Sequence, residues 1–126
     1  PLDRVPEMSR RARATTVWAA LASLGRSGVA DLVERYCRHA QMFADGIATI
    51  PGGEVLHDVV FTQVCARFGS DEHTREVVRR MLEDGTAWTT GSRWHDQSVL
   101  RVALCNWSTT DDDVAKTLAA LRRAAA

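Results

Sequence analysis

Residues 98–113, SVLRVALCNWSTTDDD, contain a predicted strand, an abrupt exit and the start of a helix. Apolar residues are nearly continuous from Val99 to Cys105, which is typical of a buried strand. Arg101 is the one full charge in that run. Because a guanidinium keeps its proton, an inward-facing Arg101 would need a carboxylate, backbone carbonyls or a bound anion. The partner of Arg101 is therefore the main question that this stretch raises.

The end of the same stretch predicts a helix N-terminus at Thr110. Threonine is a favoured N-cap residue, and the three aspartates that follow complement the positive end of the helix dipole. Over residues 111–123, helical spacing places Val114, Leu118 and Leu121 on the inward face. The acidic triplet could also form a metal cluster, but helix capping explains it without a metal.

The residues just before this stretch predict a hairpin and a further helix. Residues 86–93 have β propensity, residues 94–97 form a polar loop, and residues 98–105 are the partner strand. A helix over residues 72–83 is expected to begin at an Asp71 cap and to stop at Asp84 and Gly85. Its inward-facing residues are expected to be Val77, Val78, Met81 and Leu82.

The first half of the chain predicts two helices and two strands. Residues 1–6 are interpreted as a linker, residues 10–24 as a helix closed by Gly25, and residues 29–50 as a second helix. A short strand is expected near Val55, and a longer strand over residues 62–68. On the first helix, four apolar residues share a face: Val17, Trp18, Leu21 and Leu24.

The resulting order of elements, α, α, β, β, α, β, β, α, indicates an α+β fold. Hairpin-like strands separated by helices favour a mostly antiparallel sheet covered on one face by helices. We therefore expect three to four antiparallel strands.

Composition limits the classes of function. Sixteen basic residues balance sixteen acidic ones over 126 residues, so no net field attracts nucleic acid or an anionic membrane. No apolar run is long enough to span a bilayer, and the N-terminus lacks a signal-peptide layout, so we expect a cytoplasmic protein. Cys37, Cys65 and Cys105 are isolated, which favours buried free thiols over a disulfide or zinc site.

Histidines and tryptophans offer weaker candidates for a functional site. The four histidines lie on different elements without metal-ligand spacing, so structural or surface roles are expected. Trp88, Trp94 and Trp107 surround the hairpin and its exit, and could provide core or interface packing or line a ligand pocket.

Four segments, in this order, resemble one enzyme family. They are SRRARATTVWAALASLGRSGVADLVERYC, FTQVCARF, EDGTAWTTGSRW and LRVALCNWSTTDDDV. Together they are similar to the C-terminal portion of group II pyridoxal-phosphate-dependent amino-acid decarboxylases. The resemblance implies the small C-terminal domain of the aspartate-aminotransferase type of fold over residues 26–126. Residues 1–25 would be a linker and an interdomain helix at the end of the large domain.

The resemblance also implies what this chain does and lacks. Arg101 would bind the α-carboxylate of an amino-acid substrate, while pyridoxal phosphate would be held by a lysine of the absent large domain. Lys116 is the chain's single lysine and is interpreted as a solvated helix position, so the chain would not be catalytic alone. Interface roles follow for Arg10, Arg11 and Arg13, and a homodimer is expected. A stand-alone α+β module for ligand binding or dimerisation, without enzymatic activity, remains the alternative.

Overall fold

The computed structural model describes residues 12–126, which belong to two compact units separated after Val33. The predicted linker over residues 1–6, together with Arg10 and Arg11, lies outside the described residues. No helix among residues 12–126 combines the length and the apolar character needed to cross a membrane.

The first unit contains the start of helix α1, which spans Arg13–Ala48. Gly25 interrupts the helical backbone with φ 63° and ψ −175°, a conformation that glycine adopts without the steric cost of a Cβ. The predicted break at Gly25 is therefore confirmed. The prediction of a helix on each side of Gly25 is also confirmed, although helical geometry resumes directly after Gly25 rather than at Val29, so that the two helices together form the kinked α1. Four apolar side chains before the kink are exposed: Val17, Trp18, Leu21 and Leu24.

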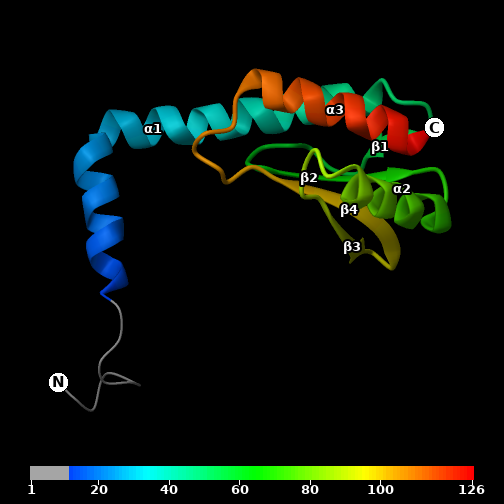
Figure 1. The fold of residues 1–126 in the computed structure, drawn as a ribbon, viewed down its shortest axis with the longest axis horizontal. Helices are drawn as coiled ribbons and strands as arrows, with labels where there is room; N and C mark the ends of the chain where they lie inside the picture. The colour runs from blue at the N-terminus through cyan, green and yellow to red at the C-terminus, as the bar shows by residue number, and fades with distance from the viewer. Residues whose placement is uncertain (1–11) are drawn as a thin grey trace, which may run out of the picture. The chain divides into compact units, whose positions relative to one another are not determined.

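The second unit is built on a four-stranded antiparallel sheet (Figure 1). Its strands are β1 (Gly53–Val55), β2 (Gln63–Phe68), β3 (Thr90–Trp94) and β4 (Gln97–Ala103), in the spatial order β1-β2-β4-β3. All three pairings are antiparallel, as the sequence predicts. β4 is a central strand because it pairs with both β2 and β3, although helix α2 (Asp71–Asp84) lies between β2 and the β3–β4 hairpin in the sequence.

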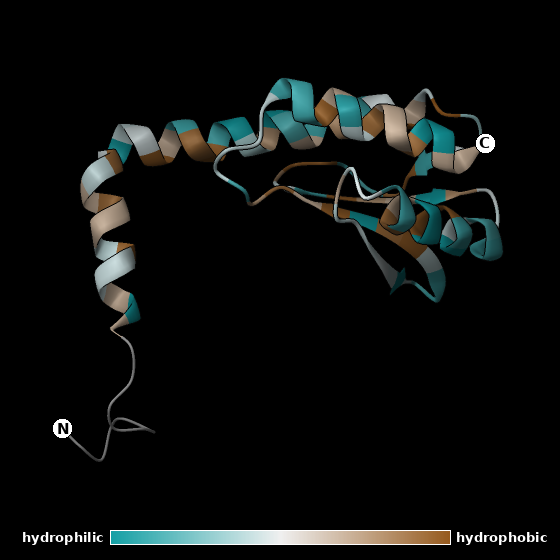
Figure 2. Cartoon of the chain, in the orientation of Figure 1, coloured by the Kyte–Doolittle hydropathy of each residue, from teal (hydrophilic) through white to brown (hydrophobic). Residues whose placement is uncertain are grey.

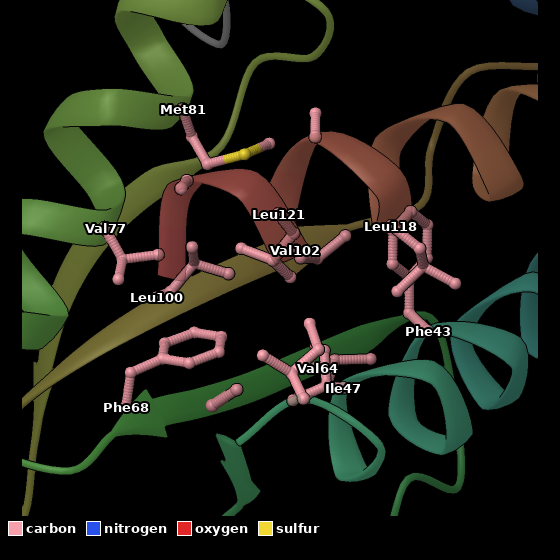
Figure 3. Packing of buried hydrophobic residues seen from close by; sticks show 14 of the residues in the cluster. Phe43, Ile47, Val64, Phe68, Val77, Met81, Leu100, Val102, Leu118 and Leu121 are labelled. Atoms are coloured by element: carbon pink, nitrogen blue, oxygen red, sulfur yellow. The ribbon is translucent and has the colours of Figure 1, made fainter. Parts of the chain in front are cut away.

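The hydrophobic core lies between one face of this sheet and three helical segments. These segments are the part of α1 after Glu34, α2, and helix α3 (Asp111–Ala125). Figure 3 shows side chains of all three helices directed toward β2 and β4. The predicted inward residues of α3 are all buried. The labelled core residues are Phe43, Ile47, Val64, Phe68, Val77, Met81, Leu100, Val102, Leu118 and Leu121.

The ends of α2 correct part of the sequence interpretation. Its N-cap is Ser70 rather than Asp71, because the Ser70 hydroxyl accepts a hydrogen bond from the His73 amide. Gly85 closes the helix in the left-handed conformation, as predicted. Leu82 is 42% exposed and does not face inward, since its neighbour Met81 already occupies the buried face. Figure 2 shows hydrophilic turns on the outer surface of α2.

The β3–β4 hairpin and the cysteines give two further corrections. Trp94 and Gln97 pair within the ladder, so the predicted four-residue loop shortens to His95 and Asp96, both with positive φ. This is a two-residue turn that matches the strand twist. The expectation of buried thiols holds for Cys65 alone. Cys37 is half-buried, and Cys105 is exposed because β4 has already ended at Ala103.

Candidate functional site

Arg101 lies on the sheet face opposite the helices. Its neighbours Leu100 and Val102 point into the core, so the alternation of a strand turns Arg101 outward. In register, Arg101 stands between Cys65 of β2 and Thr90 of β3. Its side chain is exposed and makes no ion pair or side-chain hydrogen bond within residues 12–126. The sequence alternative of an inward-facing Arg101 paired to a local acid is therefore wrong.

The charge of Arg101 acts on the adjacent strand. Burial raises the pKa of the Cys65 thiol above its ordinary value, and the positive charge of Arg101 partly lowers it again. Burial is the larger cause, so Cys65 is a neutral thiol at neutral pH. The guanidinium therefore keeps its capacity to bind an anion from outside.

A hollow of about 740 Å³ begins beside Arg101. β4 pairs with β2 as far as Gln63 opposite Ala103, whereas its pairing with β3 stops at Thr90 opposite Arg101. Beyond Arg101, β4 therefore lacks a neighbour on the β3 side, and the hollow occupies that place. Its lining includes Trp88 and Thr89. The buried Thr89 hydroxyl has no hydrogen-bond partner in the described part of the chain.

Helix α1 fixes the chain as it leaves β4 toward α3. Arg35 Nη2 donates to the Trp107 carbonyl at 2.8 Å, and the Tyr36 hydroxyl donates to the Cys105 carbonyl at 3.2 Å. Both contacts hold backbone oxygens within four residues of the end of β4. The connection from β4 to α3 forms one wall of the hollow. Helix α1 therefore holds this wall in place through the two hydrogen bonds.

The same helix also holds the first residue of α3. Both carboxylate oxygens of Asp111 accept from Arg38 Nη1 at 2.8 Å, and Asp111 Oδ1 lies 2.9 Å from His39 Nε2. His39 is fully buried, and its Nδ1 has no partner among residues 12–126. The hydrogen bond from His39 is the largest cause that lowers the pKa of Asp111, and the hydrogen bond from Arg38 is the next largest. A carboxylate at Asp111 therefore joins α1 to the start of α3.

The three consecutive aspartates at the start of α3 take part in helix capping and ion pairs, not in a metal-binding cluster. Thr110 and Asp113 make a capping box, in which each side chain bonds the other's backbone amide. Hydrogen bonds from Thr110 lower the pKa of Asp113. Asp112 pairs with Lys116 Nζ at 2.6 Å. Within residues 12–126, no group of three or more histidine, cysteine or acidic side chains is arranged to hold a metal ion.

The tryptophans divide between the two alternatives that the sequence left open. Trp94 is half-buried and stacks on His57, with ring centroids 5.3 Å apart. Trp88 is 85% exposed and lines the hollow, while Trp107 is 74% exposed and does not. Trp94 therefore has a packing role, whereas Trp88 lines the hollow.

Some residues of this site carry no sequence signal. Thr89 belongs to an ordinary β-propensity run, and Arg35 and Tyr36 belong to a helical one. Their roles depend on segments about 70 residues away or on where a strand pairing stops. Sequence reasoning missed them for that reason. Lys116 is exposed as predicted and does not line the hollow.

Fold and site together define an α+β domain with an exposed arginine on a central strand, beside an open hollow. No protein-family model matches the sequence. The chain is 28% identical over 108 residues to an aromatic-L-amino-acid decarboxylase of Drosophila lebanonensis, covering 85% of this chain and 27% of that protein.

Two solved structures share the fold. Oryza sativa TDC with pyridoxal phosphate matches 98% of this chain and 28% of its own, with a TM-score of 0.86 and 20% identity. Tryptophan decarboxylase of Catharanthus roseus in complex with L-tryptophan matches 90% of this chain and 26% of its own, with a TM-score of 0.81 and 19% identity.

The chain is homologous over most of its length to the C-terminal part of group II pyridoxal-phosphate-dependent decarboxylases. Its three helices and four-stranded antiparallel sheet, within residues 12–126, match the C-terminal domain of decarboxylase structures. The family resemblance and the fold class predicted from sequence are confirmed. The chain spans between 21% and 27% of the length of the curated relatives it matches.

Proposed function

We propose that this chain is the C-terminal portion of a pyridoxal-phosphate-dependent amino-acid decarboxylase, in which Arg101 binds the α-carboxylate of the substrate. One observation supports this role above the others: Arg101 is an exposed cation beside a hollow and has no ion-pair partner within residues 12–126. Homology to decarboxylases makes an amino-acid carboxylate the natural anion.

The chemistry of an arginine suits this task. A planar guanidinium can bind a carboxylate through two parallel N–H···O hydrogen bonds, which fixes orientation as well as position. Holding the carboxylate limits rotation of the substrate about Cα, so the scissile bond keeps one direction. The buried Val102 and Leu100 on either side hold the strand, and therefore the base of the Arg101 side chain, in place.

The described residues do not fit pyridoxal phosphate itself. The single lysine, Lys116, lies on the exposed side of α3, pairs with Asp112 and is absent from the lining of the hollow. The cofactor, which supplies an electron sink, would be bound by the large domain of a longer protein. Under this proposal residues 26–126 are the small domain and residues 1–25 are the linker and interdomain helix. The protein acts in the cytoplasm as a homodimer, and this chain alone is inactive.

Steady-state kinetics of the longer protein test the role of Arg101. Arg101→Gln is expected to lower kcat/KM about ten- to hundredfold, since two hydrogen bonds to a charged group are lost. Arg101→Lys keeps the charge but not the bidentate geometry and should recover part of the loss. Arg67→Gln is the matched control, because Arg67 also lies on the sheet but is bonded to the Gly69 carbonyl. An unchanged kcat/KM in the Arg101→Gln variant would contradict the proposal.

A stand-alone interaction module is the second candidate. Exposed apolar side chains favour it, among them Trp88, Trp107 and Phe61. Sedimentation of the 126-residue chain distinguishes the two. A stable dimer that binds no amino acid would support the module, and a monomer would count against it.

A further inference from the structure

A second hollow, separate from Arg101, lies between α2 and the β3–β4 hairpin. Its volume is about 390 Å³, within the range of pockets that hold small organic ligands. Arg101 and the connection after β4 are not part of its lining. The full lining is Thr74, Arg75, Val78, Gly91, Ser92, Arg93, Ser98 and Val99.

The floor of this hollow is apolar and open. Val78 of α2 is half-buried there, whereas Val99, two residues from Arg101 on β4, directs its side chain to the opposite face of the sheet. Gly91 on β3 has no side chain, and a Cβ added there would lie 3.6 Å from Val78 Cγ1. The missing side chain at Gly91 therefore leaves room beside Val78 for a flat apolar group.

Arg75 and Arg93 also line this hollow, and none of the lining residues carries a carboxylate. Arg75 Nη1 donates to the buried Ser98 hydroxyl at 2.9 Å, and Arg93 Nη2 donates to the Asp96 carbonyl at 2.7 Å. Each guanidinium is thus held by a neutral oxygen. Because a guanidinium has five N–H donors, most remain for an anion.

Neighbouring acids pair with these two arginines only weakly or not at all. The Asp96 carboxylate is fully exposed and lies 3.8 Å from Arg93 Nη2. On α2, Glu76 is bound by Arg79 and Arg80, whose hydrogen bonds lower its pKa to about 2. The hollow therefore combines an apolar floor with two guanidiniums, of which Arg75 has no ion-pair partner among residues 12–126 and Arg93 has one long, exposed ion pair.

We propose that this hollow between α2 and the β3–β4 hairpin binds a small aromatic carboxylate, with the ring over Val78 and Gly91 and the carboxylate between Arg75 and Arg93. The floor selects a flat apolar body, and the two guanidiniums select the charge. The site is independent of the role proposed for Arg101.

Titration of the ¹⁵N-labelled 126-residue chain with 2-naphthoate tests this site by NMR. Saturable shifts are expected at the amides of Gly91, Ser92 and Val99. Arg75→Gln and Arg93→Gln should each weaken binding about tenfold, because each removes hydrogen bonds to a charged group. Arg122→Gln, an exposed arginine of α3 bonded to Thr49, should leave the affinity unchanged.

Two further measurements keep the test decisive. Gly91→Val fills the floor without touching either arginine and should abolish the shifts. Acetate, which carries the charge without the ring, should bind more than tenfold more weakly. Shifts that do not saturate, shifts centred on Arg101, equal binding of acetate, or an affinity unchanged from the original chain in either arginine variant would each overturn the proposal.

Discussion

Asp111 is the residue on which the connection between β4 and α3 depends most directly. It accepts from Arg38 and His39, two consecutive residues of α1. Because both partners favour the ionised carboxylate, the pKa of Asp111 in the folded chain lies below its ordinary value of 3.8. A depressed pKa means that the ionised form stabilises the fold.

The pH dependence of stability should therefore change in Asp111→Asn. The contribution of Asp111 is present above the unfolded-state pKa and is lost as pH falls through the lower, folded-state pKa. Asp111→Asn is expected to be less stable than the original chain near neutral pH, with a difference that shrinks as the pH falls below the ordinary carboxyl pKa of 3.8 toward the lower pKa of the folded state. Urea unfolding at several pH values measures this.

Asp112→Asn is the matched control for that experiment. Asp112 is adjacent, but its partner Lys116 is exposed on the same helix, and exposed pairs of this kind contribute little. The interpretation of Asp111 fails if both variants show the same loss of stability at neutral pH.

Among the elements, α3 has a complete N-terminal cap. Thr110 accepts from the Asp113 amide, and Asp113 accepts from the Thr110 amide at 2.9 Å. Thr110→Ala should cost about 1 kcal/mol of unfolding free energy, because one helix amide loses its acceptor. Thr110→Ser should restore most of it, and Thr109→Ala serves as the control. Chemical denaturation would contradict this if Thr110→Ala matched the unsubstituted chain.

The close approach of α1 and α3 depends on a glycine. A Cβ at Gly46 would overlap Leu118 Cδ1 and would lie 2.7 Å from Cδ2 and 3.1 Å from Cγ of the same side chain. Gly46→Ala should therefore destabilise the fold by about 1–3 kcal/mol through overpacking, despite the better helix propensity of alanine.

A double variant isolates this contact. Leu118→Val alone should destabilise by creating space, yet combined with Gly46→Ala it should recover part of the loss. Additive losses in thermal unfolding would show that the two residues do not share the contact.

For the whole molecule, the position of the cofactor lysine is the property to test. The proposed longer protein should hold pyridoxal phosphate on a lysine outside this chain, which borohydride reduction and peptide mapping would locate. The 126-residue chain should show no specific labelling of Lys116. Pairing with Asp112 raises the pKa of Lys116 and so reduces the neutral amine that could react. Stoichiometric labelling of Lys116 would contradict this view.

Residue pattern alone predicted most of the secondary structure of the second unit, although the strand expected over residues 86–93 begins only at Thr90. Strands β1, β2 and β4 and the start of α3 lie where alternation and capping residues predict them. The secondary-structure predictions that were wrong lie where neighbouring residues give competing sequence signals. Ser70 and Asp71 are both capping residues, and a strand of the predicted hairpin could begin at any of several residues between Thr86 and Thr90. Only the surrounding backbone decides between such options.

The sequence by itself determined the α+β class, the antiparallel strands, the family resemblance and the placement of Arg101 on a strand, because these follow from periodicity, caps and local motifs. The tertiary structure alone decided that Arg101 faces away from the core beside a hollow. It also decided that α1 holds the exit of β4 and that Arg75 and Arg93 share an apolar floor. These features depend on strand register and on contacts between distant segments, which no local pattern encodes.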